Sequence, residues 1–193
     1  GAQVQADGLY LLNGSRHADL TSVVRHMEHD GATSQLIKGV ARDTARGVFQ
    51  GKIVVERGAD GTDARMGHHA LIASERAEID AKPELIIYAD DVQCAHGNTV
   101  GALDESALFY MQQRGVPAEE ARALLTQAFL IEVVDRIQKE FGLTAMAHFT
   151  CVAATKDELR QTLDALTSIG VENVLALRGD PPDGGEWTAT EGG

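Results

Sequence analysis

The chain of 193 residues has little of several features that define large classes of protein. Its 2 cysteines are too few for a disulfide framework. No segment resembles a signal peptide, and no apolar run reaches about 18 residues, the length that a membrane-spanning helix requires. Aromatic residues make up only 5%, so the core has to be mainly aliphatic. We therefore expect a soluble protein of a reducing, cytoplasmic compartment.

Basic residues are also scarce. There are 17 Lys and Arg against 29 Asp and Glu, which gives a formal net charge of −12. Nucleic acid and membrane surfaces are therefore not expected partners, because both attract clustered Lys and Arg. Hydrophobic residues at 44% and charged residues at 24% are close to ordinary globular composition, which disfavours disordered, collagen-like and coiled-coil classes.

The centre of the chain, residues 47–96, consists of short β-branched runs separated by Gly, Asp and Pro. Val54, Leu71 and Ile86 occupy comparable places in successive runs, 15 to 17 residues apart. Strands this short cannot each bury an apolar face alone, whereas stacked turns of a solenoid can. The pattern predicts a parallel β-helix, with a β-sandwich as the alternative.

Residues 1–46 show no period. His17, His26 and His29 lie there in a polar stretch. We expect them to be surface or loop histidines.

After His96 the pattern becomes helical. Asp104 is a plausible N-cap for the segment that follows, and Gly115 can end that helix in the left-handed conformation. Pro117 then opens a second helix with carboxylates in its first turn, where they complement the helix dipole. The sequence therefore predicts a helical hairpin.

The second helix carries two apolar faces about half a turn apart. Either one helix packs between two partners, or two unrelated helices are joined near residues 130–135. The first face comprises Ala121, Leu124, Leu125 and Ala128, and the second comprises Leu130, Val133, Val134, Ile137 and Phe141.

The last third reads as a β-α-β unit. Residues 143–152 and 173–177 are apolar runs typical of strands buried on both faces. Between them, Thr155 and Glu158 form a capping box, and Gly170 ends the helix. A right-handed crossover makes the two strands parallel.

Cys94 and His96 are two residues apart. In an extended segment both side chains project from one face, where they could ligate one soft metal or a cluster. A closed tetrahedral zinc site needs four ligands, so any metal role would need ligands from a partner chain. The alternative is a packed cysteine beside a hydrogen-bonded histidine.

Residues 87–115, which read IYADDVQCAHGNTVGALDESALFYMQQRG, resemble the SufB/SufD scaffold family of iron–sulfur cluster assembly, and its SufD branch in particular. The upstream blocks at 33–40, 49–64 and 74–85 resemble the same family, so the likeness spans about residues 9–130. The stretch around His17 to His29 departs from the pattern.

This resemblance implies a β-helix core over residues 1–101, truncated at its N-terminal side, and a helical region over 102–132. It also implies a heterodimer with a SufB-type partner and docking of a SufC-type ATPase on the helices. Cys94 and His96 become candidate residues facing an iron–sulfur cluster shared with the partner.

A second group of polar residues follows the two C-terminal strands. His148 lies at the end of one strand, and Arg178, Gly179 and Asp180 come directly after the next. Ligands of parallel α/β folds gather at the carboxyl ends of the strands, so these residues could share a pocket. Each one alone is also compatible with a structural role.

The segments AMAHFTC and NVLALRGDPP resemble methylenetetrahydrofolate reductase, a flavin-dependent (βα)8-barrel enzyme, over about residues 133–193. The resemblance implies that His148, Arg178, Gly179 and Asp180 would line an FAD site. A barrel needs roughly 250 residues, so a fragment of this size is too short to enclose FAD or to be an active enzyme.

The leading hypothesis is a non-enzymatic, SufD-like scaffold component, truncated or chimeric, whose last third is a reductase-like fragment. A flavin-dependent reductase and a plain structural β-helix module are the alternatives.

Overall fold

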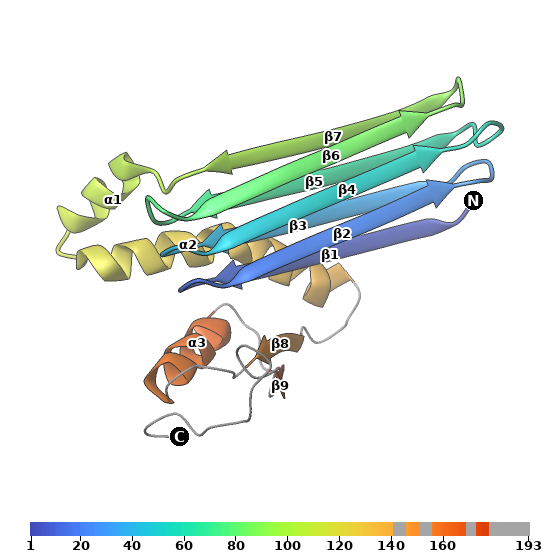
Figure 1. The fold of residues 1–193 in the computed structure, drawn as a ribbon. Helices are drawn as coiled ribbons and strands as arrows, with labels where there is room; N and C mark the ends of the chain where they lie inside the picture. Colours follow the sequence, from blue (N-terminus) through green and yellow to red (C-terminus); the bar gives the residue numbers. More distant parts are fainter. Residues whose placement is uncertain (141–145, 151–155, 169–172, 178–193) are drawn as a thin grey trace. The chain divides into compact units, whose positions relative to one another are not determined.

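The computed structural model describes residues 1–140, 146–150, 156–168 and 173–177 (Figure 1). The chain divides into two compact units, Gly1–Arg122 and Ala123–Gly193. No helix among these described ranges is long and apolar enough to cross a membrane.

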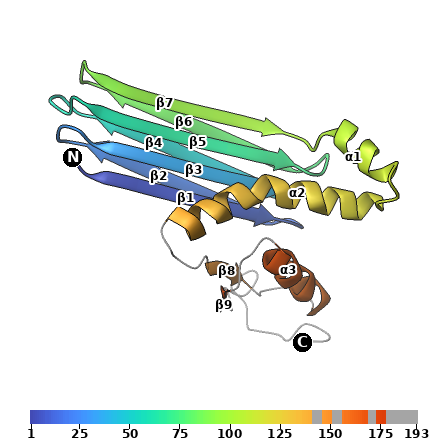
Figure 2. The ribbon, with the colours of Figure 1, turned by 180° about the vertical axis from the view of Figure 1, so that it is seen from behind.

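Seven long strands make up most of the first unit, and successive strands alternate between two sheets (Figures 1 and 2). The odd-numbered strands form a parallel sheet in the order β1-β3-β5-β7, and the even-numbered strands form a parallel sheet in the order β2-β4-β6. The strands are β1 (Gln3–Leu12), β2 (His17–His26), β3 (Ala32–Ala41), β4 (Arg46–Val55), β5 (Thr62–Ile72), β6 (Glu78–Ile87) and β7 (Val92–Gly101).

This arrangement is the predicted parallel β-helix. Val54 pairs with Ile86 across neighbouring strands of one sheet, while Leu71 belongs to the other sheet. The spacing of 15 to 17 residues seen in the sequence is therefore half a turn of the solenoid. A β-sandwich is excluded, because its sheets are antiparallel.

Residues 1–46 form the first turns of the same solenoid. His17 and His29 are exposed, as expected. The prediction of a surface or loop position is wrong for His26, which is 7% exposed and whose Nε2 lies 2.8 Å from Thr33 Oγ1. The strand ends at this residue with its side chain turned inward, and burial lowers the pKa of the imidazole.

The core lies between the two sheets and is mainly aliphatic. Strand alternation directs every second side chain inward. Two glycines make room for Tyr10 on β1: a Cβ on Gly39 would overlap the ring of Tyr10, and one on Gly47 would come within 2.8 Å of it. The central buried cluster consists of Ile37, Phe49, Ile53, Val55, Ala59, Ala64 and Met66.

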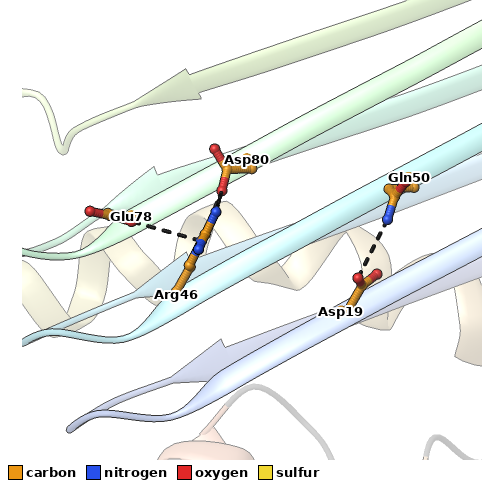
Figure 3. Close-up of polar contacts among 5 residues, drawn as sticks. All are labelled: Asp19, Arg46, Gln50, Glu78 and Asp80. Atoms are coloured by element: carbon orange, nitrogen blue, oxygen red, sulfur yellow. Dashed lines mark hydrogen bonds and ion pairs between the residues drawn. The ribbon is translucent and has the colours of Figure 1, made fainter.

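The outer face of the three-stranded sheet carries polar contacts that link successive turns (Figure 3). Arg46 donates to Asp80 at 2.6 and 2.9 Å and lies 3.7 Å from Glu78, and Gln50 donates to Asp19 at 3.4 Å. These side chains are exposed, so their contribution to stability is small.

The helices follow as predicted. Asp104 caps α1 (Glu105–Gln112) by accepting from the Ser106 N–H at 2.8 Å. Gly115 adopts φ +86°, which ends the turn between the helices, and α2 (Ala118–Asp135) begins directly after Pro117. The next five residues form a π-helical turn, η1 (Arg136–Glu140).

The first face and the Leu130, Val133 and Val134 part of the second face lie on one continuous helix, α2. Ile137 lies in η1, and Phe141 lies outside the described residues. On α2 the second face is buried at Leu130, Val133 and Val134. On the first face Ala121 is buried, whereas Leu124 is 42% exposed.

The second unit contains the predicted β-α-β segment. It consists of β8 (Met146–Thr150), α3 (Lys156–Ser168) and β9 (Asn173–Leu177). The two strands pair in parallel, with His148 opposite Leu175. The side chain of His148 and the predicted site residues Arg178, Gly179 and Asp180 lie outside the part that the structure describes.

Candidate functional site

Strand β7 is an edge strand of the four-stranded sheet, and its inward side holds the predicted metal-facing pair. Alternation places Cys94, His96 and Asn98 in one row on that side. Directly beneath them on β5 lie their register partners Ala64, Met66 and His68. The segment is extended, which is the condition under which Cys94 and His96 share a face.

Cys94 and His96 differ in exposure. Cys94 is half-buried and packs against the core cluster, whereas His96 is exposed. Burial raises the pKa of the Cys94 thiol, and the nearby Asp63 carboxylate adds to that effect. Cys94 is therefore a neutral thiol at pH 7, and metal binding there has to release its proton.

A third polar group in this row, missed by the sequence analysis, is anchored to a buried histidine. His68 is 0% exposed, and its Nδ1 lies 2.7 Å from Asn98 Oδ1. Its Nε2 lies 3.0 Å from Tyr10 Oη, and its ring stacks on Phe49 at 4.5 Å between centroids. The side chains of β1, β4, β5 and β7 thus meet around one imidazole.

The charge state of His68 follows from this setting. Burial lowers the pKa of its imidazole and raises the pKa of Tyr10 to about 12, so both groups are neutral at pH 7. A neutral imidazole donates from one nitrogen and accepts at the other. The Asn98 atom that faces Nδ1 is the carbonyl oxygen Oδ1, which can only accept, so Nδ1–H donates to Asn98 and the Tyr10 hydroxyl donates to Nε2.

Among the described residues, no third ligating side chain lies beside Cys94 and His96. Within the described ranges, no group of three or more His, Cys, Asp or Glu side chains is arranged to hold a metal ion. The row on β7 therefore offers two ligands and leaves the remaining coordination positions to another source.

An open hollow of about 680 Å³ lies elsewhere, on the outer face of the three-stranded sheet. It contains neither Cys94 nor His96. Its lining residues are Arg25, Met27, Lys52, Val54, Glu56, Arg57, Ile86 and Tyr88.

The fold and the row on β7 define a β-helix protein that presents a thiol and an imidazole on its last turn. Residues 1–129 match the family model "SUF system FeS cluster assembly, SufBD core domain". The chain belongs to this SufBD family of iron–sulfur cluster assembly proteins. Residues 121–193 match a second family model, that of methylenetetrahydrofolate reductase.

Three similar proteins carry related descriptions. An iron–sulfur cluster assembly SufBD family protein of Synechocystis is 39% identical over 129 residues, which cover 67% of this chain and 28% of that protein. SufD of Escherichia coli is 41% identical over 106 residues, covering 55% and 25%. SufD of Bacillus subtilis is 35% identical over 127 residues, covering 66% and 29%. The chain thus spans only about a quarter of the length of these relatives.

Proposed function

We propose that this chain is a SufD-like, non-enzymatic component of an iron–sulfur cluster scaffold, in which Cys94 and His96 ligate a nascent cluster. The observation that carries the proposal is their shared position on the inward row of the edge strand β7, with His96 exposed. Thiolate and imidazole are both known ligands of cluster iron. The cluster is cargo that the scaffold passes on.

The proposal requires a partner. Iron–sulfur clusters are held by four protein side chains, and the described residues offer no third ligand near Cys94 and His96. We propose that a SufB-type subunit completes the site from its own edge strand. A SufC-type ATPase would dock on the helical region that we assign to residues 102–132, following the solenoid of 1–101.

Co-expression of this chain with SufB-type and SufC-type proteins tests the proposal. Iron and acid-labile sulfide are measured in the purified complex, with wild type compared with the Cys94→Ala/His96→Ala variant. The double variant is expected to lose at least nine-tenths of both elements while still co-purifying with its partners.

Gln93→Ala is the matched control, because Gln93 is exposed on the opposite side of the same strand. It should leave cluster content unchanged. Unchanged content in the double variant would instead favour the alternative of a plain structural β-helix module.

A separate proposal concerns residues 133–193. The match to methylenetetrahydrofolate reductase favours a reductase-like fragment joined to the SufD-like part. The described part of this segment provides two paired strands and one helix, whereas a barrel closes with eight of each. These residues do not fit an enclosed FAD, and we assign no reductase step to them.

Two measurements test this second proposal. Amplification across the codons for residues 125–140 from the source DNA should fail to give one uninterrupted product if the joint is artificial. Purified protein is expected to be colourless and to ignore added FAD. Tight FAD binding with flavin absorbance would overturn the assignment of an inactive fragment.

A further inference from the structure

Asn98 is the third polar residue in the inward row of β7, and it is not one of the two proposed cluster ligands. It is exposed and shares the inward row with His96, two residues along β7. In a strand that separation is about 7 Å between Cα atoms. Its carbonyl oxygen is engaged by His68, and its amide nitrogen makes no hydrogen bond within the described residues.

The contact with His68 sets the orientation of the Asn98 amide. In the structure the Asn98 oxygen Oδ1 faces His68 Nδ1 at 2.7 Å and accepts its N–H, which leaves the NH₂ group on the side away from His68. His68 itself is held by the Tyr10 hydroxyl at 3.0 Å and by stacking on Phe49. These contacts restrict rotation of the His68 ring, and through it rotation of the Asn98 amide.

Two glycines in neighbouring strands make room for the tyrosine that contacts His68. Tyr10 reaches His68 only because Gly39 and Gly47 leave room for its ring. Glycine in a strand interior often marks a place where another group approaches closely, and both of these glycines face the ring of Tyr10. Two hydrogen bonds link Tyr10 to His68 and His68 to Asn98, and they connect the first turn of the solenoid to the last.

We propose that Asn98 donates an N–H···S hydrogen bond to a sulfur atom of the cluster held by Cys94 and His96, and that His68 is the positioning residue that aims it. This inference rests on the proposed function. Hydrogen bonds to cluster sulfurs stabilise the more negative, reduced form and so raise the reduction potential. No bond is made or broken in the protein by this contact.

The outward face of the same two strands supplies a matched control. His69 Nδ1 lies 2.7 Å from Thr99 Oγ1, which links β5 to β7 just as His68 and Asn98 do. This pair is exposed and lies on the face away from Cys94 and His96. If the inner pair acted only by tying the strands together, the outer pair should have a comparable effect.

The test uses the complex of this chain with its SufB-type and SufC-type partners, reconstituted with ferrous iron and sulfide. The variants are Asn98→Leu, Asn98→Gln, His68→Phe and the control Thr99→Val. Two quantities are measured: the rate of cluster loss to a chelator, and the reduction potential of the cluster that remains.

Asn98→Leu and His68→Phe are expected to lose the cluster about tenfold faster, as one hydrogen bond to a charged group is worth, and to lower its reduction potential. Asn98→Gln keeps the donor and should restore most of both values. Thr99→Val should match wild type. A potential unchanged in Asn98→Leu, or lowered equally in Thr99→Val, would overturn the inference.

The outcomes separate this inference from the proposed function. A wild-type complex that holds no cluster, or a Cys94→Ala/His96→Ala complex with full cluster content, overturns the proposed function and this inference with it. Loss of the cluster in that double variant, combined with wild-type behaviour in Asn98→Leu, overturns the role of Asn98 alone. Co-purification with the partners and unchanged circular dichroism confirm that each variant is folded.

Discussion

The inward rows of β5 and β7 hold the same positions of successive turns, yet they differ in what they can do. Met66 and His68 on β5 are 2% and 0% exposed, whereas their register partners His96 and Asn98 on β7 are exposed. The difference arises because β7 is an edge strand, whereas β5 lies between β3 and β7. Side chains placed as core residues become accessible on the last turn, and the rigidity of the core is retained beneath them.

Substituting a core glycine should have the largest effect on stability. Gly39→Ala puts a Cβ into the ring of Tyr10, and overpacking of this kind costs ~1–3 kcal/mol. Gly97→Ala on β7 is the control, because a Cβ there meets nothing within 4 Å. Urea unfolding of both variants measures the difference. Equal midpoints would contradict the placement of Tyr10 in the core.

Removing the buried imidazole should come next. His68→Phe keeps the stacking on Phe49 but leaves the Tyr10 hydroxyl without its acceptor, which costs about 1–2 kcal/mol of unfolding free energy. The same substitution at the half-buried His69, on the outer face, should cost far less. Comparable losses of unfolding free energy at the two positions would contradict the larger structural role assigned to His68.

The pH dependence of stability sharpens the contrast between inner and outer histidines. The pKa of His68 is lowered in the folded state, so below about pH 6.5 the unfolded chain binds the proton more readily. Stability should therefore be complete above that pH and fall on acidification through it. Unfolding curves between pH 5 and 8 measure this, and His68→Phe should flatten the fall. An identical slope in both proteins would assign the effect to other groups, such as His26.

The outer face should respond least. Arg46→Ala removes contacts with Asp80 and Glu78, but all three side chains are more than half exposed. Salt screens such pairs and water replaces their hydrogen bonds. The urea midpoint is expected to stay within experimental error at 0.15 M salt. A loss as large as that of Gly39→Ala would mean that the outer contacts, rather than the core, hold the turns together.

The sequence predicted the solenoid where its strands carry large aliphatic residues. Val54 and Ile86 lie one full turn apart on the outer face, with Leu71 about half a turn from each, and all three stand in aliphatic runs that make the repeat visible. On β1 the inward positions include Ala6 and Gly8, and on β2 they include Ser22. Small and polar residues give no hydrophobic period, which is why the first turns were not recognised.

Local signals were more reliable than those that depend on register. The caps at Asp104 and Gly115 involve only a few neighbouring residues, and both predictions are confirmed. His68 stands beside His69, and an adjacent histidine pair looks like a polar surface. Only the pairing of β5 with β3 and β7 places one imidazole in the core and leaves the other outside.

The candidate ligands were predictable in part: their spacing along the strand is a local signal, whereas their surroundings depend on strand register. The spacing of Cys94 and His96 predicted a shared face on an extended segment, and β7 provides that segment. The third member of the row could not be predicted, because the role of Asn98 depends on the buried His68 beneath it. Whether the row binds iron stays a prediction.

Pulsed electron paramagnetic resonance of the reduced complex, prepared with ¹⁵N-labelled histidine, tests the central claim most directly. If His96 ligates the cluster, wild type will show a strongly coupled ¹⁵N nucleus that disappears in His96→Ala and persists in the Gln93→Ala control. The same coupling in wild type and His96→Ala, or none in wild type, would contradict the assignment of this row as the cluster site.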